Sequence, residues 1–343
     1  MNRTVYTDYI SALIQQFWDY AETELEGEKE LLESDQRNPR RPPVFQKSFA
    51  AKNILVSLDA DEESRNAIVS TLPPNERHRH FASMRSSQAL AQSVFGNLAV
   101  GGWLGLLDGL TTDENLPAFG TDLKQASMQL EYSVKHLGEP RPTSVDVWFD
   151  SEHRIAVECK LTEPDFGTCS RPRLRQGADR NYDRDYCDGT YTRQRNRQTR
   201  CSLSEIGVEY WTHIPEILRW RNDEDTSPCA LRNTYQLIRN VLAACVNESG
   251  RVESRQSHAL IIYDAANPAF QEGGLAREQL AAARSALREP DMLRSLSWQS
   301  LVDHLECSTD LAELVRQLRA KYGFRSIGPI SITHDCAKSS WHD

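Results

Sequence analysis

The stretch "TSVDVWFDSEHRIAVECKLTE", residues 143–163, combines two apolar segments with three charged residues. Apolar residues alternate along 145–149 and again along 155–159, a pattern typical of two β-strands joined by a short turn. Charged side chains are costly on the buried face of a strand, so Asp146, Glu158 and Lys160 need an explanation.

Side chains alternate between the two faces of a strand. We therefore expect Val145, Val147 and Phe149 on one face of the first strand, with Asp146 and Trp148 on the other. By the same rule, Ala156, Glu158 and Lys160 share one face of the second strand, so the last two are neighbours on one side of the sheet.

Pairing Asp146 with Glu158 would fix the register of the hairpin. Asp150 would then pair with Arg154, which leaves residues 151–153 as a three-residue loop of common length. A slip of one residue would place Asp146 on the wrong face. The register is thus a direct test of whether these carboxylates lie together.

Two carboxylates and one ammonium that converge at a strand end suit a magnesium site. Mg²⁺ prefers oxygen ligands and keeps positions open for water and phosphate oxygens; Mn²⁺ is the alternative metal. Such a metal polarises a phosphodiester and lowers the pKa of a water, and a lysine can offset the charge that develops on the phosphate. The alternative interpretation is a hairpin with an exposed polar face and a surface salt bridge.

Asp, a spacer and Glu-x-Lys on adjacent strands resemble the PD-(D/E)xK nuclease superfamily, and longer blocks extend the resemblance to a restriction-endonuclease-like bacterial branch. The blocks occur in order over about residues 72 to 265: "RHRHFASMRSSQALAQSVFGNL", "TSVDVWF" with "VECKLTEPDFGTCS", "YCDGTY" with "RCSLSEIGVEYW", and "YQLIRN". The resemblance implies an α/β fold: a restriction-endonuclease-like core with a central mixed β-sheet flanked by helices.

The same resemblance assigns roles to individual residues. Asp146 and Glu158 would be metal ligands, and Lys160 would be the catalytic lysine. Glu131, expected on a helix before the hairpin, occupies the place of an added acidic ligand; an ordinary exposed glutamate is its alternative. Gln236 in "YQLIRN" would reach the site from the following helix, and helix packing is the alternative.

Two positions depart from the usual pattern of this resemblance. Val145 stands where the superfamily usually has proline before the first acid, although many members lack it. Glu163 lies beyond the expected end of the second strand and is a weaker spare ligand.

The charge distribution points to phosphate binding in one segment. The net charge is −9, yet residues 171–200 contain nine arginines and four aspartates. Arginine is suited to bidentate phosphate contacts, so we expect Arg193, Arg195, Arg197 and Arg200 to grip a DNA backbone. A solvated surface loop is the alternative.

Eight cysteines raise the question of a second metal. Cys169, Cys187 and Cys201 lie in a loop-rich segment where structural zinc would compensate for a thin core, with His213 or Cys229 as the nearest fourth ligand. No Cys-x-x-Cys pair is present, and free thiols are the alternative.

Several classes of protein are not favoured by the sequence. No run of eighteen apolar residues predicts a membrane span, and the first residues do not resemble a signal peptide, so a cytoplasmic location is expected. The Gly-rich segment "VGGWLGLLDGL" lacks the Gly-Lys-Ser/Thr of a nucleotide-binding loop.

The chain is expected to have three parts. Residues 1–71 form a helical N-terminal extension, 72–265 the nuclease core with an Arg- and Cys-rich insertion at about 164–227, and 266–343 a C-terminal helical region. Helices are predicted over the first 35 residues, at 47–71, within 82–98, 122–138 and 228–250, and over most of the chain from 275. A strand is predicted at "HALIIYD".

The leading hypothesis is a Mg²⁺-dependent endonuclease that hydrolyses DNA in restriction or anti-phage defence. Its partners would be DNA and, in addition, a second copy of the chain or a protein of the same defence system. The alternatives are a catalytically silent nuclease-fold protein and a zinc-stabilised binding or scaffold protein.

Overall fold

The centre of the computed structural model is a five-stranded mixed sheet with the strands in chain order. The structure describes residues 3–34, 36–57, 61–120, 122–140, 142–169, 187, 189–190, 201–220 and 228–326. The first three strands pair antiparallel, and the third, fourth and fifth pair parallel. The strands are β1 (Ser127–Val134), β2 (Thr143–Asp150), β3 (Arg154–Cys159), β4 (Ser257–Tyr263) and β5 (Leu293–Ser297).

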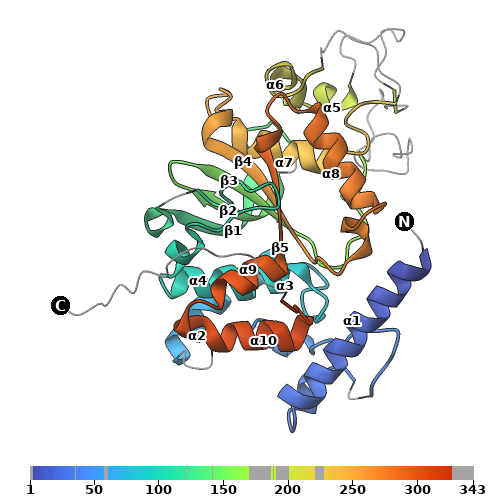
Figure 1. Ribbon diagram of the computed structural model, residues 1–343, viewed down its shortest axis with the longest axis vertical. Helices are drawn as coiled ribbons and strands as arrows, with labels where there is room; N and C mark the ends of the chain where they lie inside the picture. The colour runs from blue at the N-terminus through green and yellow to red at the C-terminus, as the bar shows by residue number, and fades with distance from the viewer. Residues whose placement is uncertain are drawn as a thin grey trace, which may run out of the picture.

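Helices cover both faces of this sheet (Figure 1). The α-helices are α1 (Arg3–Glu24), α2 (Glu62–Ser70), α3 (Ser87–Ala91), α4 (Asn97–Val100), α5 (Ser202–Glu205), α6 (Tyr210–Ile217), α7 (Tyr235–Cys245), α8 (Leu275–Ala286), α9 (Trp298–Leu305) and α10 (Ala312–Tyr322). Figure 1 shows α6, α7 and α8 on one side of the sheet and α3, α4, α9 and α10 on the other. The expected mixed sheet with flanking helices is therefore confirmed.

Two apolar cores result, one for each face. Val157 and Ile155 of β3 belong to the core shared with α3, α9 and α10, whereas Ala156 belongs to the core shared with α7 and α8. Strand β4 likewise sends Leu260 to the first core and Ile261 to the second. Parallel strands covered on both faces need such continuous apolar sequences, which is why "HALIIYD" forms β4 as predicted.

The helix nearest the N-terminus packs against the last described helix. The Phe17 ring of α1 meets the Tyr322 ring of α10 edge-on at 5.8 Å. The Gln16 side chain donates a hydrogen bond to the Ala320 carbonyl, 304 residues further along the chain. Residues from the two ends of the described chain thus share one core.

The hairpin that opens the sheet has the predicted register. Val147 pairs with Val157 and Asp150 with Arg154, so residues 151–153 form the loop. The expected sharing of faces is only partly right. Val147 and Phe149 lie in the core of α3 and α9, but Val145 lies in the opposite core with Trp148.

The physical reason is a break in the pleat at Glu131. Glu131 has a φ of 50°, in the left-handed region that non-glycine residues seldom adopt. On β1, Leu130 packs in one core while Val134 packs in the other, although both have even numbers. The alternation of side chains between the two faces of the sheet therefore reverses on β1 and β2 at the same level, beside Asp146.

Strand β1 corrects a prediction. Residues 122–138 were expected to form a helix, but only a short 3-10 turn, Leu123–Gln125, precedes the strand Ser127–Val134. Helix-favouring residues such as Leu130 and Glu131 suggested the wrong element, although the alternation of apolar and polar residues already has the strand period. Pairing with β2 overrides local propensity here.

Other helix boundaries also differ from expectation. Helix α1 ends at Glu24 rather than near residue 35, and α7 begins at Tyr235 rather than at the proline of residue 228. The region 47–71 divides into a 3-10 segment, Lys47–Asn53, and α2. Strand β5 interrupts the C-terminal region that was expected to be mostly helical.

The helix predicted within 82–98 is confirmed, with a π-helical segment, Gln92–Gly96, between α3 and α4. It begins at Ser86, whose side chain accepts the N–H of Ala89 at 3.2 Å as an N-cap. Within the described residues, no helix combines the length and the apolar character that crossing a membrane requires.

Candidate functional site

Glu158 is the best-connected charged residue at the end of β3. Its side chain lies on the face covered by α7 and is only 5% exposed. Oε1 accepts a hydrogen bond from Gln236 at 2.7 Å, and Oε2 accepts one from Asn240 at 2.9 Å. These two donors lie one helical turn apart on α7, so a single helix face fixes both oxygens of the carboxylate.

Lys160 follows on the same side and is 7% exposed. Its Nζ lies 2.8 Å from Oε1 of Glu158 and donates to Oε1 of Gln236 at 3.2 Å. The backbone around it is held by an N–H bond to the Ile262 carbonyl at 2.7 Å and by the Trp298 indole at 3.1 Å. The ammonium is therefore placed by the sheet and by α7 together.

Asp146 joins the pair from β2. Its Oδ2 accepts the backbone N–H of Cys159 at 2.7 Å, which brings the carboxylate to the end of β3 beside Glu158. Burial raises the pKa of Asp146 well above its usual value, and the nearby Glu158 and Glu131 carboxylates raise it further. The expected meeting of Asp146 with Glu158 and Lys160 is what the structure contains.

Glu131 also lies at this site, but on β1 and not on a helix as expected. Its side chain is buried, and Oε1 accepts a hydrogen bond from Gln88 of α3 at 2.7 Å. The left-handed backbone of Glu131 lies where the pleat breaks, and its carboxylate is close enough to raise the pKa of Asp146. Three carboxylates and one lysine therefore gather at the end of β3 and beside the middle of β1 and β2.

Glu158 and Lys160 each stabilise the charged form of the other. Burial raises the pKa of Glu158, but Lys160 and Arg239 outweigh burial and the pKa is lowered. Burial lowers the pKa of Lys160, but Glu158, Glu163 and Asp146 outweigh it and the pKa is raised. Glu158 and Lys160 are thus an ion pair, whereas burial and the neighbouring carboxylates disfavour the ionised form of Asp146.

Three contributors to the site were not predicted as such. Asn240 and Arg239 approach Glu158 from α7, the second at 4.0 Å, and Gln88 holds Glu131. The four-residue spacing of Gln236 and Asn240 on a predicted helix was the one available signal for Asn240. Gln88 belongs to the block "SSQAL", which favoured a packing helix.

Glu163 lies just beyond β3, near enough to Lys160 to raise its pKa, but its hydrogen bonds go to other groups. Its Oε2 accepts the N–H of Leu161 at 2.7 Å, and Oε1 accepts the Ser87 hydroxyl at 3.1 Å. These bonds fix the turn after the strand against the start of α3. The contacts favour a structural role over that of a spare ligand.

The ends of the parallel strands form a second polar group next to the pair. Asp264, just after β4, accepts hydrogen bonds from Gln299 of α9 at 2.6 Å and from the Tyr9 hydroxyl at 2.8 Å. Tyr9 also donates to the Leu161 carbonyl at 2.8 Å, and Tyr6 donates to the Thr162 carbonyl. Helix α1 therefore borders the site, which no sequence pattern indicated.

The arginines predicted to bind DNA, Arg193, Arg195, Arg197 and Arg200, lie outside the described residues, so their role stays a prediction. The cysteines Cys169, Cys187, Cys201 and Cys229 are described. No group of three or more His, Cys, Asp or Glu within the described ranges is already arranged as a set of metal ligands.

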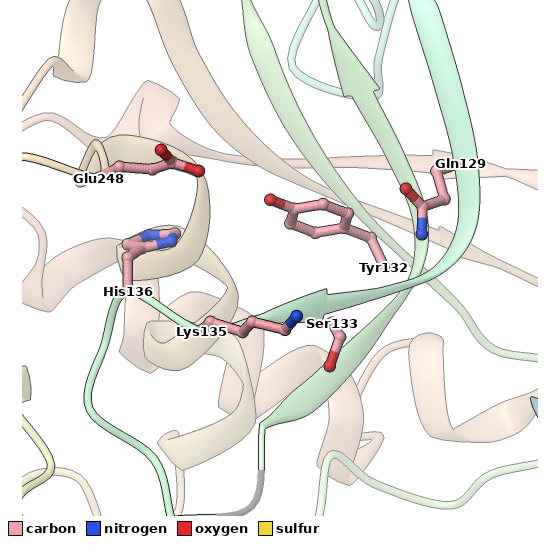
Figure 2. A pocket seen from close by; sticks show the side chains of 6 residues that line it. All are labelled: Gln129, Tyr132, Ser133, Lys135, His136 and Glu248. Atoms are coloured by element: carbon pink, nitrogen blue, oxygen red, sulfur yellow. The ribbon is translucent and has the colours of Figure 1, made fainter.

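A cavity of about 460 Å³ lies elsewhere, along β1 and the loop after α7. Figure 2 shows the Tyr132 ring reaching from β1 towards Glu248 and His136 across this cavity, with Lys135 beside them. Tyr132 stacks on Trp148 at 4.7 Å, which makes one wall rigid. None of the residues that line the cavity belongs to the group of Asp146, Glu158 and Lys160, the acid–lysine group.

A mixed sheet between helix layers, with acids and a lysine on two adjacent strands, is consistent with a restriction-endonuclease-like fold. A family model described as "Restriction Endonuclease associating with ARP" matches residues 12–323. The match covers most of the chain, and the chain therefore belongs to this restriction-endonuclease family. Searches of curated proteins and of solved structures gave no significant match.

Proposed function

We propose that the protein is a metal-dependent endonuclease that hydrolyses phosphodiester bonds of DNA in restriction or phage defence. The observation that carries the proposal is the group of Asp146, Glu158 and Lys160, which three separate contacts hold together where the middle of β2 meets the end of β3. Membership of a restriction-endonuclease family supports DNA as the substrate.

The donor set suits a hard divalent cation such as Mg²⁺ or Mn²⁺. Asp146 and Glu158 would bind it, with Glu131 as a third carboxylate. Within the described residues, Oδ1 of Asp146 and Oε2 of Glu131 accept no hydrogen bond, so both oxygens are available as ligands. Burial raises the pKa of Asp146, and the Glu158 and Glu131 carboxylates raise it further; a bound cation would favour the ionised form.

The protein's own residues then have distinct tasks. Gln236 and Asn240 hold the Glu158 carboxylate in one orientation, because each donates to a different oxygen. Lys160 places a positive charge beside the same carboxylate, where it offsets negative charge that develops on a phosphate during attack by water. When bound, the metal would polarise the phosphodiester and lower the pKa of the attacking water.

The test is cleavage of plasmid DNA, linear DNA and RNA in Mg²⁺, Mn²⁺ or EDTA. We expect metal-dependent cleavage of DNA, and a loss of more than ~100-fold in Asp146→Asn, beyond what loss of a supporting contact costs. Folding should survive, because removing one of several mutually repelling acids leaves stability unchanged or slightly higher. Asp150→Asn, an exposed aspartate on the same strand, is the matched control and should cut normally.

The rival function is a nuclease-fold protein that binds DNA without cutting it. It is favoured by one observation: Glu158 already has hydrogen bonds to both oxygens and an ion pair, which a purely structural polar network also requires. DNA binding by folded wild-type protein with no cleavage in any metal would support this rival. Cleavage that is unchanged in Asp146→Asn would remove the proposed site.

A protein partner is part of the proposal. The family description names an association with ARP, so we propose that this chain also acts with a partner protein of that name. Co-expression followed by co-purification and a cleavage assay of the complex would test it. A pair that neither co-purifies nor changes cleavage would contradict it.

A further inference from the structure

Four cysteines that are far apart in the sequence come together beside the start of α7. The N–H of Cys229 donates to the Gly189 carbonyl at 2.8 Å, so the segment with Cys187 lies against Cys229. The N–H of Cys169 donates to the Arg232 carbonyl at 2.8 Å, and residues 229–232 form one turn closed by an N–H bond of 2.9 Å. Backbone hydrogen bonds thus join three of the four cysteine segments.

The Cys187 thiol has a backbone donor. The Gly189 N–H, two residues after Cys187, points to the sulfur of Cys187 at 3.3 Å. An amide donor in this position stabilises negative charge on sulfur, which is the form in which a thiol binds a metal.

The fourth cysteine, Cys201, is placed by packing. Cys169, Cys201 and Cys229 pack against the same apolar core. Cys187 lies close enough to Cys201 and Cys229 to act on both thiols. Cys187, Cys201 and Cys229 carry free thiols. All four cysteines therefore lie in one part of the structure.

We propose that Cys169, Cys187, Cys201 and Cys229 bind a structural zinc ion. Four thiolates form a closed tetrahedral set for zinc at about 2.3 Å, with no position open for water or substrate. In the described residues the thiols do not stand as a set of metal ligands, so zinc binding requires them to move closer together. The site is separate from the acid–lysine group and does not depend on nuclease activity.

The choice of fourth ligand follows from position. His213, the other candidate from the sequence, lies against Gly250 in the loop after α7. Cys229 instead begins the turn that leads into α7 and towards Gln236. Zinc would therefore link the Arg-rich insertion to α7, the helix whose side chains hold Glu158.

The experiment measures metal content and a spectrum rather than activity. Protein purified without a metal-affinity tag should contain a single zinc ion per chain by mass spectrometry. Replacement of zinc by Co²⁺ should give the intense visible absorption of tetrahedral cobalt–thiolate coordination. Cys187→Ser/Cys229→Ser should lose both signals, whereas Cys307→Ser, an exposed cysteine outside the group, and His213→Ala should keep them.

The cobalt spectrum of the wild-type protein keeps the proposal testable if the double variant does not fold. Folded wild-type protein with neither zinc nor a cobalt–thiolate spectrum would overturn it, and so would iron in place of zinc. Zinc that stays bound in a folded double variant would also overturn it.

Discussion

Two lysines are buried among the residues that the structure describes, and their surroundings differ. Lys160 at the end of β3 is 7% exposed and lies among three carboxylates. Lys321 in α10 is 0% exposed, and its Nζ donates to neutral oxygens, the Asn53 carbonyl at 2.6 Å and Asn53 Oδ1 at 2.8 Å. The rings of Tyr20 and Tyr322 complete the surroundings of this ammonium.

The consequences for protonation are opposite. Carboxylates outweigh burial at Lys160 and raise its pKa, whereas burial lowers the pKa of Lys321 to about 7. Lys321 shows that this fold can bury a lysine with neutral partners. The acids around Lys160 therefore exceed what burying a lysine requires, which favours a functional reason for them.

The largest expected effect comes from removing each ammonium in turn. Lys160→Met should reduce DNA cleavage by more than ~100-fold, because the charge beside the phosphate is lost. Lys321→Met should leave cleavage per folded molecule unchanged. Initial rates on plasmid DNA, normalised to the folded fraction from circular dichroism, measure both variants. Equal losses in the two variants would remove the contrast between the lysines.

The second effect is a dependence of stability on pH that belongs to Lys321. Because its pKa is lowered from 10.5 to about 7, the unfolded state binds more protons between these values, and stability should rise with pH in that window. The contribution is about 1.4 kcal/mol per pH unit and should be absent in Lys321→Met. Urea unfolding at pH 7, 8 and 9 measures it, with exposed Lys52→Met as control. A slope that is identical in wild type and Lys321→Met would refute the assignment.

A smaller effect on cleavage is expected from removing a hydrogen bond that holds Glu158. Asn240→Ala removes the 2.9 Å bond to Oε2 and should lower cleavage by roughly 10- to 100-fold, as loss of a second contact to a ligand commonly does. Higher Mg²⁺ should restore part of the rate if metal binding is what weakens. Asn233→Ala, exposed before the same helix, should have no effect. An Asn240→Ala enzyme with wild-type rates at every Mg²⁺ concentration would argue against this support.

The smallest effect should come from a surface cation on the helix that carries Lys321. Arg316 bonds to Glu24 and Glu313 at 2.8 Å, but its side chain is 48% exposed. Exposed ion pairs contribute about 0–1 kcal/mol, so Arg316→Ala should lower the free energy of unfolding by less than ~1 kcal/mol. Thermal unfolding at low and high salt measures it, and a loss of several kcal/mol would show that the pair fixes α1 on α10.

The hairpin was predictable because its evidence is local. Alternation and a short loop determine which residues of β2 and β3 pair, so the meeting of Asp146 with Glu158 follows from 21 consecutive residues of sequence. Gln236 was found only through a resemblance, since no rule of spacing brings α7 over β3. The central residues of the candidate site could thus be predicted from the sequence, but few of the residues around them could.

The rest depends on contacts between distant residues. The helix expected around Glu131 is a strand, because pairing with β2 outweighs its helix-favouring residues. The break of the pleat at Glu131 has no sequence signature, since glutamate seldom adopts a positive φ. Tyr9 and Asp264, 255 residues apart, could be joined only by the fold.

The packing of α1 on α10 sets the order in which the protein can be completed. The apolar side of α1, with Leu13, Ile14 and Phe17, is synthesised well before α10, which supplies part of its cover. At roughly 5–20 residues per second, the 304 residues between Gln16 and Ala320 take on the order of 15–60 s to translate. During that time the nascent helix exposes a hydrophobic surface that a ribosome-associated chaperone would shield.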